Sequence, residues 1–500
     1  MRVTNAMLKN NMMLGLNKNM GKLNTLYDQM NSLKKIQRPS DDPIILGRSL
    51  KLRLNVLETE QYKTNVGEAR SWMEISEKAM DNSNEILNAI RTECAQAANG
   101  TLKVEDRQKI TAVVDQLKKQ LIQEANANYA GRSVFAGYKT DEKVLFEKEQ
   151  TMTPPADFKQ EFGKNDVETV GYRENDYYRM RLAYGEVDYN PANPADLADP
   201  AGSNLEFDVP ASVEVKVITS DHIFYNGDLV KKADVEKLIE DEIKAGTYQP
   251  PTESTYDPPE GTAYFFQDTG ELILSKEDYS KMDNTTTVGI KYQKTNFKEG
   301  DPNPKVFFNT EPGVDPPLYT STISNSQKDL QKLEYEIGIG TKLDVNVLGN
   351  RVFTPTLLRD IDEMIRLTGI YDKAEEEVNG KAFTYTDAAG KEIETKIITR
   401  SPKETINLSK LFTAGLGNTD KALKQLSGQV ADLGSRMKRL DITEKRLGDD
   451  EVTFTELLSR TEDVELERVY IDFNTQYAVY QSALQATAKV VQPTLMDFLR

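Results

Sequence analysis

The chain has 500 residues, which is enough for two to four domains at roughly 100 to 200 residues each. Its 80 acidic and 63 basic side chains leave a formal net charge of −17, which repels phosphates and anionic lipids. We therefore expect neither nucleic acid nor a membrane surface as a partner. The single cysteine, Cys94, excludes an intrachain disulfide framework and is expected to be a small core residue on a helix.

The first segment of the chain is predicted to be a helix with one apolar face. Residues 1–20 lack the apolar segment and cleavage site of a secretory signal peptide, so no cleaved signal peptide is expected, and any export would use another route. No stretch reaches the roughly 20 apolar residues that span a bilayer, so no membrane insertion is expected. The apolar stripe alternates steps of four and three through Met12, Leu16, Met20, Leu23, Tyr27 and Met30.

A break follows at residues 38–43. Pro39 disfavours helical geometry in the residue before it, Asp42 offers a cap acceptor, and Pro43 suits the first turn of a helix. A second helix is predicted from there and a third at about 105–129. The second carries the apolar residues Leu46, Leu50, Leu54, Leu57, Val66, Trp72, Ile75, Ile86 and Ile90. Both patterns predict helices of a bundle.

The composition changes from about residue 141 to 320, where proline pairs and tyrosines are frequent. Short runs with period-two alternation, bounded by Gly, Pro and Asn, indicate strands. One isolated helix is predicted inside this region, at 232–244. Helical spacing returns over 352–377, and a small hairpin that turns at 387–390 follows. The predicted strands include residues 213–219, 263–274, 334–340 and 343–347.

The last third of the chain holds the most regular pattern, a heptad from Leu423 to Leu458 that is interrupted by Glu444 and Glu451. It indicates either a coiled coil or, as we favour, a long helix of an antiparallel bundle. Thr461 is expected to cap the final helix. That helix carries an apolar ladder through Leu466, Val469, Phe473, Tyr477, Tyr480, Leu484, Ala488, Val491, Leu495 and Phe498.

These patterns predict an α+β fold with discontinuous domains. Both chain ends form a long-helix bundle or coiled-coil rod, and the middle is a β-rich inserted outer domain of one or two lobes. The expected inner domain comprises residues 1–38 and 465–500, whose helices become ordered on assembly. The expected rod comprises 39–140 and 354–464, with a hairpin insert near 379–401, and the expected outer domain is 141–353.

The sequence offers little catalytic chemistry. His222 is the only histidine, so a zinc-protease helix is excluded, and its apolar neighbours favour a structural role on a strand. No cofactor, metal site or catalytic residue is predicted, and the chain is not expected to be an enzyme. The sequence GIGTK near Gly338 does not have the spacing of a phosphate-binding loop.

Both ends of the chain resemble the bacterial flagellin superfamily. The similarity is carried by RVTNAML from Arg2, and by SRTEDVELERVY at 459–470 with the ladder that ends in LMDFLR. Three further stretches are more similar to the hook-associated proteins that join the hook to the filament: RPSDDP at 38–43, NANYAGRSVFAGYKTDEKVLF at 126–146 and IGIGTKLDVNVLGNRVF at 337–353. The middle insert is longer than in a typical member, and the RLSSG segment of flagellins is absent.

The resemblance implies a structural protein at the hook to filament junction, extracellular and exported by the flagellar type III apparatus. The implied partners are the first hook-associated protein, flagellin, further copies of the chain in a ring, and an export chaperone on the C-terminal helix. It implies that the terminal stripes pack in the inner tube of the assembly. The expected assembly residues are Leu16, Leu23, Met30, Phe473, Tyr480, Leu484, Val491, Leu495 and Phe498.

Three alternatives remain open at this point. The first is a flagellin-type filament subunit, which the hook-associated motifs disfavour. The second is a surface adhesin whose insert binds a glycan while its helices form a stalk. The third and weakest is an enzymatic insert, because only carboxylates could supply its acid and base.

Overall fold

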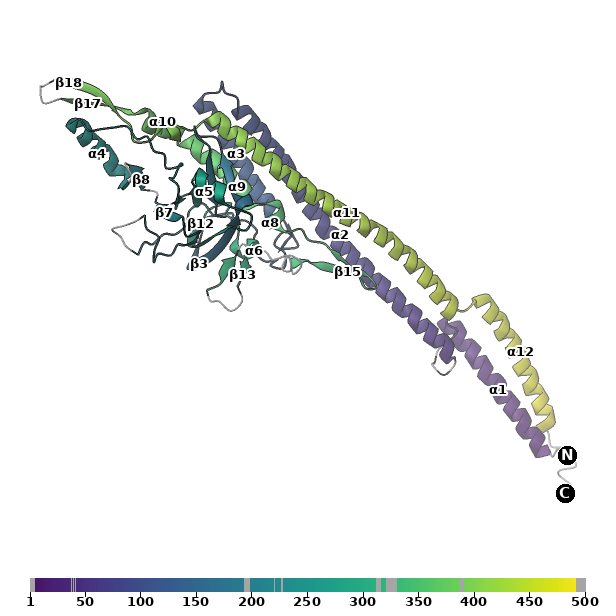
Figure 1. Cartoon of the computed structure of the whole chain (residues 1–500). Helices are drawn as coiled ribbons and strands as arrows, with labels where there is room; N and C mark the ends of the chain where they lie inside the picture. Colours follow the sequence, from purple (N-terminus) through teal and green to yellow (C-terminus); the bar gives the residue numbers. More distant parts are fainter. Residues whose placement is uncertain are drawn as a thin grey trace, which may run out of the picture. The chain divides into compact units, whose positions relative to one another are not determined.

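The computed structural model describes residues 5–491 apart from 37, 39, 41, 193–197, 220, 226–227, 312–315, 321–330 and 387–390. The chain forms two compact units. Unit 1 comprises Met1–Glu68, Glu336–Lys342 and Lys438–Arg500, and unit 2 comprises Ala69–Tyr335 and Leu343–Met437. The predicted α+β fold is confirmed, with helices at both chain ends and strands between them (Figure 1). The three-part domain division stays a prediction.

The helices match the sequence pattern closely. The described α-helices are α1 (Asn5–Ser32), α2 (Pro43–Ala97), α3 (Val104–Ala125), α4 (Lys232–Ala245), α5 (Lys276–Lys281), α6 (Pro304–Phe307), α8 (Gly349–Val352), α9 (Pro355–Gly369), α10 (Tyr371–Asn379), α11 (Leu408–Glu462) and α12 (Leu466–Val491). The third helix is shorter than predicted. The side chain of Asn126 accepts hydrogen bonds from the backbone N–H groups of Val144 (2.9 Å) and Leu145 (3.1 Å), and the chain leaves the helix there.

Helices α2 and α11 run antiparallel, as their ion pairs show. In unit 1 Lys63 Nζ lies 2.5 Å from Glu451, and in unit 2 Arg91 Nε lies 2.5 Å from Asp420. Glu451 is one of the two glutamates that interrupt the predicted heptad. Its carboxylate is paired with Lys63 of the facing helix, so this polar residue is accommodated between the two helices. Every seventh residue is buried along both helices, as expected of coiled-coil-type packing: Leu52, Val66, Met73, Met80, Leu87 and Cys94 in α2, and Leu426, Leu433, Leu440 and Leu447 in α11.

Two five-stranded sheets form the β-rich part of unit 2. One has the order β4-β5-β11-β10-β7 and the other β13-β14-β3-β12-β6. Aromatic rings fill the space between strands: the Phe158 ring stacks on Tyr292 at 5.0 Å, and Phe207 contacts Phe265 of the other sheet at 5.1 Å. The strands of these sheets are β3 (Gln150–Gly163), β4 (Glu168–Val170), β5 (Tyr177–Arg181), β6 (Glu206–Asp208), β7 (Glu214–Ile218), β10 (Thr262–Phe266), β11 (Glu271–Leu274), β12 (Thr287–Phe297), β13 (Asn309–Thr310) and β14 (Leu318–Thr320).

The remaining strands form two-stranded hairpins. They are β1 (Asn128–Tyr129) with β2 (Arg132–Ser133), β8 (His222–Tyr225) with β9 (Asp228–Lys231), β15 (Glu334–Gly338) with β16 (Thr341–Asp344), and β17 (Lys381–Thr386) with β18 (Glu392–Ile397). Helix α4 packs against two of these hairpins through Ile223, Ile239, Ile243 and Ile397, so segments far apart in sequence share one small core (Figure 1). The predicted turn at 387–390 lies outside the described residues.

Candidate functional site

The terminal helices α1 and α12 lie side by side in unit 1 and run antiparallel (Figure 1). The Tyr27 ring lies 6.5 Å from that of Phe473, and Phe473 stacks on Tyr477 at 6.2 Å. Further along the pair, Gln476 Nε2 donates to Asn19 Oδ1 at 3.3 Å. The apolar ladders at the two chain ends therefore meet within the chain itself.

The sequence-predicted assembly residues fall into three groups. Five are half-buried along the helix pair, namely Leu16, Leu23, Met30, Phe473 and Tyr480. Leu484 is more open, with 41% of its surface exposed. Val491 is the last residue of α12 and its side chain is not described, whereas Leu495 and Phe498 lie outside the described residues. Whether these nine residues contact a neighbouring subunit remains a prediction.

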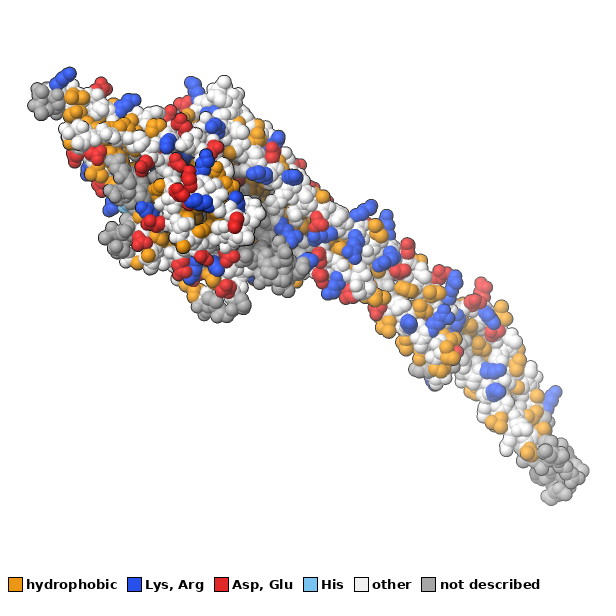
Figure 2. Space-filling view, viewed as in Figure 1, with side chains coloured by type: hydrophobic (Ala, Val, Ile, Leu, Met, Phe, Trp, Pro, Cys, Tyr) orange, Lys and Arg blue, Asp and Glu red, His pale blue; other side chains and the backbone are white. Residues whose placement is uncertain are grey.

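Other apolar side chains of unit 1 are more exposed than the predicted stripe. Ile471 is 63% and Leu14 67% exposed. Their positions lie out of register with the stripe, and only this extra apolar content on a second face could have revealed them. Figure 2 shows apolar side chains gathered over this part of the chain. The exposed set on α1 and α12 also includes Met7, Leu8, Met13, Tyr470 and Val479, together with four members of the predicted stripes, Met20, Tyr27, Leu466 and Tyr477.

Helix α2 carries a second exposed apolar stripe in unit 1. Leu50, Leu54 and Leu57, which the sequence pattern assigned to a bundle face, are between 51% and 59% exposed. That assignment is wrong within the single chain, because the seam with α11 uses Leu52 and the residues that follow it in steps of seven. A two-helix pair buries one face of each helix, so a second apolar face is left uncovered.

An ionic cluster joins the two breaks in the helices of unit 1. Lys34 and Asp463 form an isolated antiparallel bridge, in which the Lys35 N–H donates to the Glu462 carbonyl at 2.6 Å. Lys34 Nζ lies 2.7 Å from Asp463 and 3.1 Å from Glu462, and Arg53 Nε lies 2.5 Å from Glu462. We call this cluster the clasp. It fixes the start of α12 beside the end of α1.

Glu462 is the centre of the clasp. Its side chain is only 8% exposed and accepts hydrogen bonds from Arg53 and from the buried Ser49 hydroxyl. The hydrogen bond from Arg53 contributes most to lowering the pKa of Glu462 to about 2. The predicted cap at Thr461 is wrong: its hydroxyl donates to the Leu457 carbonyl inside α11, which continues to Glu462.

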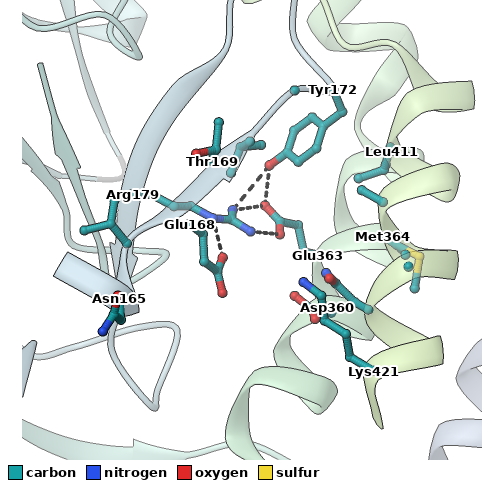
Figure 3. Close-up of a pocket in the computed structure, with 17 residues that line it drawn as sticks. Asn165, Glu168, Thr169, Tyr172, Arg179, Asp360, Glu363, Met364, Leu411 and Lys421 are labelled. Carbon is teal, nitrogen blue, oxygen red and sulfur yellow. Dashed lines mark hydrogen bonds and ion pairs between the residues drawn. The ribbon is translucent and has the colours of Figure 1, made fainter. Parts of the chain in front are cut away.

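Unit 2 contains a network of buried charges beside a cavity of about 490 Å³ (Figure 3). Arg179 on β5 makes a bidentate ion pair with Glu363 on α9, at 2.6 and 2.8 Å. Arg179 also lies 2.9 Å from Glu271 on β11. The Tyr172 hydroxyl donates to Glu363, and Figure 3 shows these side chains converging from the sheet and the helix.

The charges in this network satisfy one another. Arg181 lies 2.6 Å from Asp360 and 2.7 Å from Glu168. Burial disfavours the ionised form of Glu363, but the Arg179 guanidinium outweighs it and holds the pKa of Glu363 well below its usual range. Because the carboxylates and guanidinium groups are already paired, the network attaches the sheet to α9 and offers no free acid or base.

Sequence reasoning missed both the clasp and the buried network, since neither has a local spacing signal.

Among the described residues no group of three or more His, Cys, Asp or Glu side chains is arranged to hold a metal ion. None of the described helices is long and apolar enough to cross a membrane. Cys94 is buried as predicted, and burial raises the pKa of its thiol to about 12.

Comparison with known families shows what the two ends of the chain are similar to. The family model for the bacterial flagellin N-terminal helical region matches residues 3–140, and that for the C-terminal helical region matches residues 416–499. The two matched regions contain the α1/α12 pair and the long helices α2 and α11. The two ends of the chain are therefore similar to the N- and C-terminal helical regions of bacterial flagellin, and the matched residues make up less than half of the chain.

Among curated proteins the chain is similar to flagellar hook-associated protein 3. It is 28% identical to that protein of Salmonella typhimurium over 142 residues and 24% identical to that of Escherichia coli over 218 residues. The matches cover 28% and 43% of this chain, and 45% and 65% of those relatives. A filament core protein of Treponema maltophilum is 30% identical over 128 residues, covering 25% of this chain and 44% of the relative.

Solved structures give a looser likeness. The flagellar junction protein FlgL from Legionella pneumophila is 12% identical with a TM-score of 0.31, covering 84% of this chain and 100% of that one. FlgL from Xanthomonas campestris is 11% identical with a TM-score of 0.31, covering 81% and 97%. TM-scores this low carry no argument, so the similarity to flagellar proteins rests on the family models and the curated relatives.

Proposed function

We propose that the chain is a junction subunit of the bacterial flagellum that connects the hook to the flagellin filament and assembles through α1 and α12. The observation that carries this proposal is the exposed apolar face of the paired terminal helices. Burying one large apolar side chain contributes roughly 1.5 to 3 kcal/mol, so neighbouring subunits that cover this face would stabilise it strongly. The curated relatives named flagellar hook-associated protein 3 support a role at the hook.

The proposed partners are the first hook-associated protein, flagellin and further copies of the chain in a ring. The inner packing residues are the nine predicted ones together with the exposed face that includes Leu14 and Ile471. The stripe of Leu50, Leu54 and Leu57 would add a second contact further along unit 1. Ordered neighbours on several sides are needed, because an isolated helix pair covers only part of this apolar surface.

We further propose that the chain leaves the cell through the flagellar type III apparatus without cleavage and acts outside the cell. Before export a chaperone would cover α12, because an exposed apolar stripe of this length favours aggregation. No catalytic role and no cofactor are proposed.

Immunogold labelling of intact cells tests the location. Antibody raised against residues 141–320 should give a single cluster of particles at the base of each filament. Labelling along the whole filament would instead make the chain a filament subunit. Labelling of the cell body away from flagella would favour an adhesin and contradict the proposed function.

A further inference from the structure

Unit 2 contains another cavity, of about 250 Å³, that the proposed assembly role does not use. Its walls come from the end of β7, the start of β8, helices α9 and α10, and residues 399–406. These segments are distant in sequence, so the cavity is a product of the fold. It is large enough for a monosaccharide-sized molecule.

The cavity wall has cationic groups that the protein leaves unpaired. Arg366 on α9 and Lys373 on α10 line it, and neither makes an ion pair with any residue that the structure describes. Arg400, in contrast, is neutralised by Glu377 at 2.7 Å and by Glu404 at 3.3 Å. The two cations among the lining residues provide positive charge of the kind that recognises a carboxylate.

Two buried polar atoms at the cavity lack a hydrogen-bond partner. They are Nε of Arg173, a residue that is 5% exposed, and Oγ1 of Thr269. Arg173 is otherwise held in place, because its guanidinium lies 3.7 Å from the centre of the Tyr256 ring and its Nη1 donates to the Glu404 carbonyl at 2.6 Å. Both atoms are fully enclosed by protein, as are Nε and Nη1 of Arg181 in the buried network, so a molecule in the cavity would contact other atoms of Arg173 and Thr269.

Other lining groups are hydrogen-bond acceptors and hydroxyls. Glu253 and Asp268 line the same cavity, as do Thr219 and Thr399. Carboxylates beside hydroxyls suit the hydroxyl groups of a sugar, whereas the cations suit an acidic group on it. We propose that this cavity binds a small polyhydroxylated carboxylate such as a hexuronic acid, with Arg366 and Lys373 holding its carboxylate.

Ligand-observed NMR on the full chain tests the proposal with glucuronate as the probe. Saturation transfer to glucuronate is expected, and glucose, which has the hydroxyls without the carboxylate, should bind at least tenfold more weakly. Methyl glucuronide carries a substituent on its anomeric oxygen, as the terminal residue of a glycan does. It should bind as well as glucuronate does if the natural ligand is part of a glycan. Binding of free glucuronate alone would identify a free sugar acid as the source.

The double variant R366Q/K373Q should bind glucuronate at least tenfold more weakly. K237Q, on the exposed face of α4 and outside the cavity, is the matched control for loss of positive charge and should bind normally. No saturation transfer to glucuronate would show that the cavity holds only water and would overturn the proposal. Equal displacement of glucuronate by inorganic phosphate or by glutamate would overturn the sugar-acid class.

Discussion

The sheets of unit 2 and the terminal helix pair of unit 1 differ in how their side chains are covered. In unit 2 Arg179 and Glu363 are buried and paired with each other, so the structure is complete within one chain. In unit 1 Leu14 and Ile471 are more than half exposed, although water is an unfavourable environment for them. The buried charges of unit 2 are paired within one chain, whereas the proposed function predicts that neighbouring subunits cover the exposed apolar face of unit 1.

The largest effect is expected from charge placed on the exposed apolar face of α12. The double variant Y470D/I471D should abolish incorporation into the flagellum, because burial of two carboxylates at a subunit contact costs several kcal/mol. The folded monomer should be unaffected, since both side chains are exposed in it. Complementation of motility in a strain that lacks the chain, together with circular dichroism of the purified variant, measures the two effects.

The control for this variant adds charge at a polar position of unit 1 that is outside α1 and α12. T455D changes an exposed polar residue of α11 and should assemble normally. Motile cells with normal junctions in Y470D/I471D would contradict the proposed assembly face.

The next largest effect is expected in unit 2. Glu363→Gln removes the charge that Arg179 and Tyr172 contact, leaving a buried guanidinium without its bidentate partner. The free energy of unfolding should fall by about 3 to 5 kcal/mol, as for other broken buried ion pairs. Urea unfolding can be followed through Trp72, the only tryptophan, which lies in unit 2. Glu376→Gln on the exposed face of α10 is the control and should leave the midpoint unchanged.

The sequence predicted the helices well because their packing has a period. Leu426, Leu433 and Leu440 are buried at steps of seven, as the heptad indicated. The clasp and the buried network could not be predicted in this way. Lys34 and Asp463 are 429 positions apart, and Arg179 and Glu363 are 184 apart. No local spacing encodes a pairing over such distances, so only the folded chain reveals these partners.

The exposed stripe of α2 shows a second limit of periodicity. Leu50, Leu54 and Leu57 have helical spacing, and this predicts an apolar face without saying what covers it. Apolar residues at helical spacing occur both where the face is covered within one chain and where a neighbouring subunit covers it. The structure shows which apolar residues remain uncovered within one chain.

The clasp offers a smaller perturbation that is confined to unit 1. Glu462→Gln removes the carboxylate that accepts from Arg53 and Ser49 and pairs with Lys34, and should cost about 1 to 3 kcal/mol. Hydrogen exchange of α1 and α12 amides should accelerate, while Trp72 fluorescence in unit 2 stays unchanged. Glu456→Gln breaks an exposed pair with Arg460 on the same helix and should have almost no effect. Equal exchange in both variants would contradict the role of the clasp.

Acid should act on the clasp in the same direction. The pKa of Glu462 is lowered from 4.5 to about 2 by its partners, so the carboxylate stabilises the folded state fully above pH 4.5. This contribution is lost as the pH falls from 4.5 towards 2. The protection factors of the α12 amides, which correct for the slower intrinsic exchange in acid, should therefore fall over this range in the parent chain, and the E462Q variant should show a smaller change. A pH profile that is identical in both would rule out Glu462 as the group responsible.

The smallest effect is expected at the start of α2, where the cap can be removed without disturbing any packing. Asp42 Oδ1 accepts hydrogen bonds from the N–H groups of Ile44 and Ile45, each at 3.0 Å. Asp42→Ala should cost about 1 kcal/mol and accelerate exchange in the first turn of α2. Asp42→Asn keeps the acceptor without the charge and should retain most of the protection. Because Ile44 is 84% exposed, no core contact is lost, and equal exchange in the two variants would show that charge and not the cap stabilises this turn.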